Sequence, residues 1–165
     1  MHEAGCPAEE KGDQMKRIRL AVLFCFLLCT AALYGCSSAP AIEDRTWTLS
    51  IVQSETDGSI AACAPEKQML YAGAKPLRLQ CEASGGTYRI TDPDSGEVWS
   101  GGYRVYSRTP ADTIYTLDGN WDGEEKEYIA SVGITTYYNQ DAEYTLIVKG
   151  DAYSVYFTAP MEENG

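Results

Sequence analysis

The feature that most restricts the fold is the spacing of apolar residues from Trp47 onward. In that part of the chain apolar and polar residues alternate in short runs, and helical spacing is not seen. A strand with this alternation buries one face and exposes the other. The runs place their apolar residues at Trp47-Leu49-Ile51, Leu77-Leu79-Cys81-Ala83, Tyr88-Ile90, Tyr144-Leu146-Val148 and Tyr153-Val155-Phe157.

Turn-forming residues separate these runs. Gly supplies positive φ, Pro presets φ, and Asp or Asn bonds to the backbone nearby. The expected turns are Ser84–Gly86, Asp92–Gly96, Asp118–Gly123, Tyr138–Asp141 and Gly150–Asp151. We therefore predict an all-β fold over residues 47–160, an antiparallel meander of eight or nine strands. Many short antiparallel strands form either a sandwich or a barrel. The sequential hairpins favour a meander that closes into a small barrel, because closure removes exposed sheet edges. Residues 161–165 are expected to form a flexible tail.

The N-terminal part has the pattern of a secretory signal peptide. Lys16, Arg17 and Arg19 precede an uncharged run, Leu20–Leu33, of 14 residues. This run is shorter than the roughly 20 residues that a bilayer-spanning helix needs. We predict a signal peptide over residues 1–35. Residues 1–14 carry four acids, the wrong sign for such a leader, so we expect translation to start at Met15.

The end of the apolar run resembles the lipobox of bacterial lipoproteins. Leu33 lies three residues before Cys36, and the small residue Gly35 lies just before it. The resemblance implies that Leu33 and Gly35 are recognised by the signal peptidase. It also implies that Cys36 carries a thioether-linked diacylglycerol and often an amide-linked acyl chain such as palmitate. Two or three chains give stable anchoring.

These features predict an extracytoplasmic protein of the cell envelope. Its lipid would hold it on the plasma membrane, or on the outer membrane if the source has one. Residues 36–46 are small and polar, and are expected to form a lipidated tether. We expect the protein to be a monomer.

Charge and composition argue against several functions. The net charge of −11 disfavours binding to nucleic acid, because phosphates repel carboxylates. The one His, His2, precedes Cys36, so the chain after the lipobox lacks the groups of a Ser-His-Asp or Cys-His site. We expect no enzymatic activity, no cofactor and no metal site.

Cys63 and Cys81 are the cysteines that follow Cys36. A pair in an extracytoplasmic domain favours a disulfide. The alternative is two buried free thiols.

Two further segments have a functional and a structural interpretation. Asp118–Gly123 matches the opening of a calcium-binding EF-hand loop, but Ile129 stands where that loop needs Glu, so a hairpin turn is the favoured interpretation. Trp99, Tyr103 and Tyr106 form either a ligand or glycan platform or ordinary strand packing, which we favour. Gly101 and Gly102 are expected to mark a bulge or a bend in that strand.

The domain as a whole resembles the small lipocalin-like barrels of bacterial lipoproteins, and META-like domains equally. The residues concerned are Thr46–Leu49, Gly102-Tyr103 and Tyr153–Phe157. The resemblance implies a lipid-anchored barrel that binds a small apolar or aromatic ligand, through residues that the sequence does not identify. The alternative is a structural or interaction lipoprotein whose barrel is filled and whose outer face binds an envelope protein. A contiguous exposed apolar patch would favour the alternative.

Overall fold

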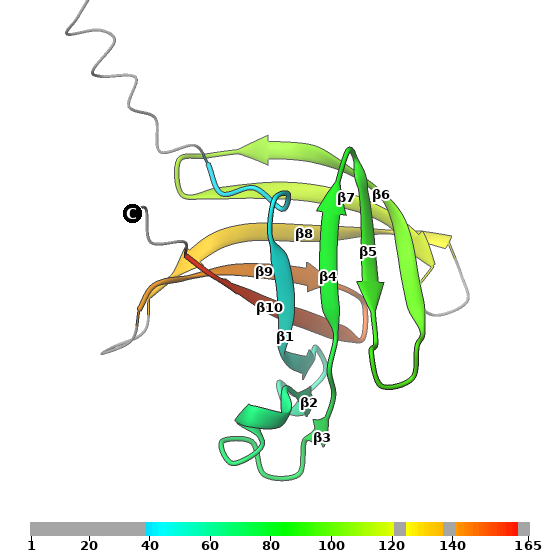
Figure 1. Cartoon of the computed structure of the whole chain (residues 1–165), viewed down its shortest axis with the longest axis vertical. Helices are drawn as coiled ribbons and strands as arrows, with labels where there is room; N and C mark the ends of the chain where they lie inside the picture. The colour runs from blue at the N-terminus through cyan, green and yellow to red at the C-terminus, as the bar shows by residue number, and fades with distance from the viewer. Residues whose placement is uncertain (1–38, 121–124, 137–140, 162–165) are drawn as a thin grey trace, which may run out of the picture. The chain divides into compact units, whose positions relative to one another are not determined.

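The computed structural model describes residues 39–120, 125–136 and 141–161 (Figure 1). All the described residues belong to one compact unit, Ser38–Gly165. The predicted signal peptide, the lipobox residues Leu33, Gly35 and Cys36, and residues 162–165 lie outside the described residues. In the described ranges, no helix is both long and apolar enough to span a bilayer.

The described residues form ten strands and one short 3-10 helix, η1. The alternating runs explain the strands, because β-branched and aromatic residues fit a half-buried pleated surface. The elements are β1 (Thr46–Ser54), β2 (Ile60–Cys63), η1 (Pro65–Lys67), β3 (Lys75–Pro76), β4 (Gln80–Ser84), β5 (Thr87–Thr91), β6 (Val98–Arg108), β7 (Asp112–Asn120), β8 (Glu125–Thr135), β9 (Glu143–Lys149) and β10 (Tyr153–Pro160).

Eight of these strands close into a barrel. From β4 to β10 each strand pairs antiparallel with the next, β1 pairs with β4, and β10 returns to pair with β1. In Figure 1, β1, β4 and β5 run vertically in front, and β7 to β10 cross behind them. The predicted antiparallel barrel is confirmed.

The structure departs from a simple meander at β2 and β3. One edge of β1 pairs with β4 over Thr46–Thr48 and with β2 over Ile51–Gln53. The short β3 pairs parallel with β2. These two strands and η1 therefore extend the sheet at the lower end of β1 without entering the eight-strand ring (Figure 1).

The set of β1 residues that face the core also differs from the prediction. A register shift against β10 lies between Leu49 and Ile51, so Ser50 is an extra residue in this strand. Trp47 and Leu49 are buried in the core as expected, but Ile51 faces outward and Val52 packs against the core in its place. A bulge changes which face the later residues occupy.

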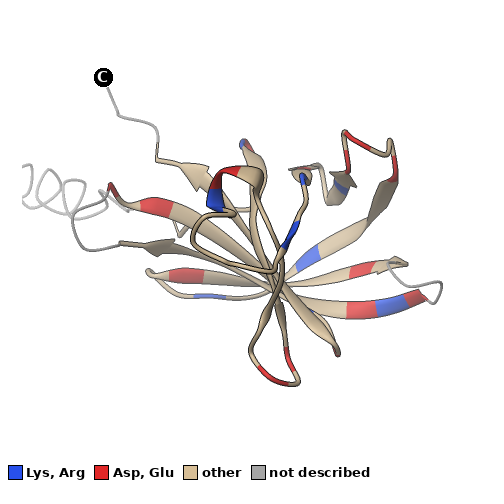
Figure 2. Ribbon diagram, turned by 90° about the horizontal axis from the view of Figure 1, so that it is seen from below, with Lys and Arg blue, Asp and Glu red and all other residues tan. Residues whose placement is uncertain are grey.

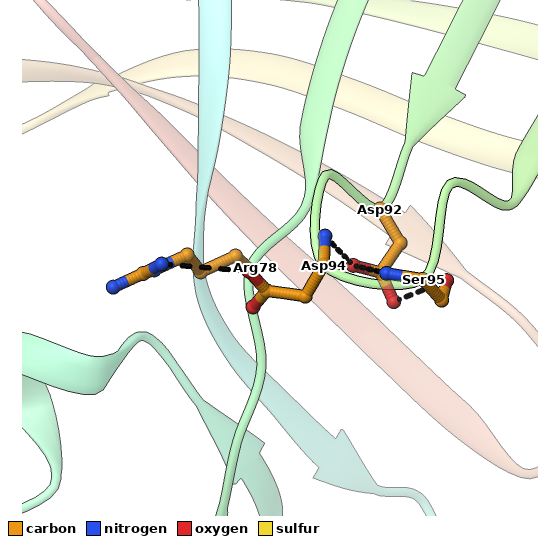
Figure 3. Close-up of polar contacts among 4 residues, drawn as sticks. All are labelled: Arg78, Asp92, Asp94 and Ser95. Carbon is orange, nitrogen blue, oxygen red and sulfur yellow. Dashed lines mark hydrogen bonds and ion pairs between the residues drawn. The ribbon is translucent and has the colours of Figure 1, made fainter.

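The turn at Asp92–Gly96 forms as predicted and joins β5 to β6. The Asp92 carboxylate accepts hydrogen bonds from the Asp94 amide at 2.8 Å and from the Ser95 hydroxyl at 2.8 Å (Figure 3). The Ser95 hydroxyl and the Asp94 amide lower the pKa of Asp92. Asp94 also pairs with Arg78 at 3.4 Å, which links this turn to the segment before β4.

β6 pairs with β5 on one edge and with β7 on the other, and two glycines lie where these two pairings overlap. Its first half pairs with β5 over Val98–Gly102, and its second half pairs with β7 from Gly101 onward. A Cβ atom at Gly101 would lie 1.7 Å from the backbone oxygen of Asp118, whereas a Cβ at Gly102 would meet nothing closer than 3.8 Å. Gly101 therefore permits the close approach of β6 to β7. The register shift of β6 against β7 lies between Val105 and Ser107, and not at the two glycines.

The two glycines give a matched test. Gly101→Ala is expected to lower the free energy of unfolding by about 3 kcal/mol, because the methyl group overlaps a backbone atom that cannot move alone. Gly102→Ala is expected to change it by less than about 1 kcal/mol. Denaturant unfolding of both variants measures the difference, and equal effects would contradict the proposed close approach.

Candidate functional site

The barrel interior is filled by the protein's own side chains. A side chain that lined a cavity wide enough for water would keep some accessible surface. Trp47, Leu146 and Phe157 keep 0 %, and Tyr115 keeps 2 %. The interior therefore packs as a core in the described residues. Its buried members are Ile42, Trp47, Leu49, Cys81, Ala83, Tyr88, Ile90, Tyr115, Leu117, Tyr128, Ala130, Val132, Leu146, Val148, Phe157 and Ala159.

Ile42 comes from the segment before the first strand. We call Ala41–Arg45 the plug segment, and the barrel end where β1 begins the barrel mouth. Ile42 is 0 % exposed. Its amide donates a hydrogen bond to the Tyr115 hydroxyl at 3.1 Å, and its carbonyl accepts one from Trp47 Nε1 at 2.8 Å. Two buried aromatic polar groups are thus satisfied by the backbone of one residue.

The neighbours of Ile42 also contact aromatic rings. The Arg45 guanidinium carbon lies 3.7 Å from the ring centre of Tyr144 and 5.5 Å from that of Trp47. Such cation–π contacts contribute about 0.5 to 2 kcal/mol each. The Tyr103 hydroxyl donates a hydrogen bond to the Glu43 carboxylate.

This packing changes the expected domain boundary. Residues 36–46 were expected to form a tether, but from Ile42 the chain already belongs to the folded domain. The sequence signal was weak, because a single Ile among small and polar residues has no periodicity. Burial of its side chain contributes about 2 to 3 kcal/mol to holding this segment in place.

The aromatic residues of β6 mainly serve packing. Trp99 and Tyr103 pack against the core, and Tyr103 meets Tyr115 edge-on with ring centres 5.7 Å apart. Burial and the Glu43 carboxylate raise the pKa of Tyr103 to about 12. Tyr106 differs, since it is 73 % exposed. The three rings therefore do not form one platform.

The expected disulfide between Cys63 and Cys81 is not formed, and both residues are buried free thiols. Cys63 lies opposite Ile51, and Cys81 opposite Trp47, along the same edge of β1. Four strand residues span about 13 Å, well beyond the roughly 7 Å between Cα atoms that a disulfide allows. Sequence spacing could not show this, because it does not give the position of each strand along β1. Burial raises the pKa of the Cys81 thiol to about 12.

Alkylation without reductant tests whether Cys63 and Cys81 are free thiols. In the folded chain, iodoacetamide should modify Cys63 and Cys81 roughly a hundredfold more slowly than after unfolding, because both are buried and Cys81 resists ionisation. After unfolding in denaturant alone, both should be alkylated. Peptide mass spectrometry reads out each site. A peptide pair still joined through Cys63 and Cys81 would contradict the structure.

The segment that resembles a calcium loop lies only partly within the described residues, because residues 121–124 are outside them. Asp118 and Asn120 end β7, and Glu125 begins β8, as in a hairpin. The Asp118 carboxylate pairs with Arg104 at 3.2 Å, and Arg104 also contacts Glu127. In the described part of the chain no group of three or more His, Cys, Asp or Glu residues is arranged to hold a metal ion.

A mostly apolar row, interrupted by Ser131, crosses the outside of the barrel. Strand register places Ile114, Ser131, Ile147, Tyr156 and Ile51 opposite one another in turn, across β7, β8, β9, β10 and β1. Ile129 lies next to this row on β8 and is 46 % exposed. We call Ile51, Ile114, Ile129, Ile147 and Tyr156 the outer stripe. From β7 to β1 it spans about 19 Å at the usual strand spacing.

Charges around the outer stripe are acidic in balance. Near the stripe, Arg104 pairs with Asp118 at 3.2 Å and Lys149 pairs with Glu55 at 3.6 Å. Asp112 and Glu143, on the other side of the stripe, form no ion pair within the described residues. Figure 2 shows carboxylate residues spread over strands and loops of the domain.

Two open depressions lie beside β6. One, of about 530 Å³, is lined by residues of β4, β5 and β6, including Glu82, Arg89 and Ser100. The other, of about 500 Å³, is lined by residues of β6, β7 and β8. The second is lined by the charged residues Asp118, Lys126 and Glu127, whereas a small-molecule pocket is lined mostly by apolar side chains.

Comparison with known proteins adds no functional assignment. The chain matches no protein-family model, no curated protein and no solved structure.

Proposed function

We propose that this protein is a lipid-anchored lipoprotein of the cell envelope whose filled barrel binds an envelope protein through the outer stripe. The observation that carries the proposal is the packed interior. With Trp47, Phe157 and Leu146 fully buried, an apolar ligand inside the barrel would have to displace core side chains. This favours the filled-barrel interpretation over a lipocalin-like ligand carrier.

The outer stripe supplies an apolar centre for such an interface. Ile129 is exposed and the other members of the stripe are half-buried. Contiguous apolar residues at a surface indicate an interaction site, whereas scattered ones are normal. Interfaces combine an apolar centre with a polar rim. Here the rim is acidic, and the net charge of the chain is −11. The partner is therefore expected to present apolar side chains surrounded by Lys and Arg.

The anchor would hold the barrel mouth near the membrane. Only residues 37–41 separate Cys36 from the buried Ile42. Fully extended, the six steps between these two residues reach about 21 Å. The outer stripe lies on the side of the barrel, so it would stay accessible to a neighbouring membrane-bound protein.

The anchor is tested at Cys36. Cys36→Ser should abolish incorporation of labelled palmitate and release the protein from washed membranes, because the thioether needs this sulfur. Cys29→Ser, within the apolar run, is the matched control and should leave both unchanged. Membrane retention of the Cys36→Ser protein would refute the anchor.

The outer stripe is tested by photo-crosslinking in cells. A benzoylphenylalanine at position 129 should give one discrete product with another protein, and the same group at the outward Gln80 of β4 should not. Ile147→Asp should reduce the product about tenfold, since a buried carboxylate costs more than 1.4 kcal/mol. High salt should reduce it further, because rim charges are screened.

Three outcomes would contradict this proposal. They are no product at position 129, an equal product at position 80, or a product of twice the chain's own mass. The last would indicate a contact between copies of this chain instead of a basic partner.

A further inference from the structure

The barrel mouth contacts the backbone and the side chain of one residue, Ile42. The N–H and C=O of Ile42 are neighbours across a single residue, and each meets a buried aromatic polar group, Tyr115 Oη at 3.1 Å and Trp47 Nε1 at 2.8 Å. The aliphatic side chain between them is fully buried. The mouth therefore contacts three features of one residue, which are its aliphatic side chain, its backbone N–H donor and its backbone C=O acceptor.

These polar groups discriminate among occupants. An acyl chain or other hydrocarbon would fill the space of the Ile42 side chain, but would leave Trp47 Nε1–H and the Tyr115 hydroxyl without these partners. Buried donors and acceptors left unpaired are costly. A peptide with an aliphatic residue satisfies both. An acidic residue after it would also accept the hydrogen bond from the Tyr103 hydroxyl, as Glu43 does.

The plug segment occupies the barrel mouth without pairing with any strand. No backbone–backbone hydrogen bond joins residues 39–45 to the rest of the described chain, so they can leave while every strand ladder stays intact. Asp44 adds strain, because its φ of +63° is unfavourable for a residue with a side chain. Segments with few backbone bonds open locally at lower free energy than the whole domain unfolds.

We propose that the barrel mouth is a binding site for an aliphatic residue within a peptide, and that the plug segment is its exchangeable resident occupant. A peptide supplied in trans competes with the plug segment for Trp47, Tyr115 and Tyr103. Such a peptide has two sources with the same chemistry, the plug segment of a second copy and a segment of another protein. This site is separate from the outer stripe, and does not depend on it.

The test uses the full chain and a fluorescein-labelled peptide with the sequence of residues 39–46, followed by fluorescence anisotropy. The Ile42→Ala protein should bind this peptide at least tenfold more tightly than the unaltered protein, because its own plug segment competes less. A peptide with Asn in place of the Ile should bind at least tenfold more weakly. Ile90→Ala, the same change elsewhere in the barrel interior, is the matched control and should bind no better than the unaltered protein.

Three results would overturn the proposal. The first is no gain in affinity on Ile42→Ala, and the second is an equal gain on Ile90→Ala. The third is displacement of the peptide by dodecanoate at equal concentration, which would show that the mouth selects hydrocarbon alone. Sedimentation of the unaltered protein distinguishes the sources, since dimers that grow with concentration indicate exchange between copies and monomers indicate a foreign peptide.

A second measurement needs no variant that could fail to fold. By hydrogen exchange of the unaltered protein, the Ile42 amide should exchange at least tenfold faster than the paired amides of Val132 and Leu146. Equal protection would mean that the plug segment leaves only when the barrel unfolds, and would refute exchange.

Discussion

The hydrogen bond from Trp47 Nε1 to the Ile42 carbonyl is the contact on which the arrangement of the barrel mouth depends. Trp47, the second residue of β1, lies fully inside the barrel and holds the preceding segment over the open end. The Tyr115 hydroxyl holds the same residue from the opposite wall. One short segment thereby fills the space between strands that are distant in sequence, and the core reaches the end of the barrel.

A filled interior directs function to the surface. In a barrel of eight strands the inner space is just wide enough for side chains or one small ligand. Here the large residues Trp47, Tyr88, Tyr115 and Phe157 occupy it. The outer stripe and the plug segment are then the two places where we propose that this domain binds other molecules. The first needs no change in the barrel, and the second needs only local opening.

Much of the fold could be predicted from the sequence, because alternation reports directly on a half-buried strand. Tyr144, Leu146 and Val148 show this, as do the turns at Asp92–Gly96 and Gly150–Asp151. Closure followed from the number of strands and the cost of open edges. The strand count was slightly low, because the short β2 and β3 carry little pattern.

The predictions that were wrong depend on local backbone irregularities or on contacts between distant residues, which the sequence pattern does not show. A single bulge at Ser50 moves Ile51 from the core to the outer stripe, and no alternation pattern marks such an insertion. The separation of Cys63 from Cys81 depends on where two strands meet β1. The role of Ile42 depends on Tyr115, 73 residues away in sequence. The function of the site was least predictable, since outward residues such as Ile147 become a stripe only when five strands are placed in register.

The most direct test of the filled barrel is native mass spectrometry of the full chain, released gently from its membrane. A packed interior predicts the mass of the polypeptide with its covalent lipid and without a bound small molecule. A reproducible non-covalent adduct of small-molecule mass that disappears on denaturation would contradict the packing on which the proposed function depends.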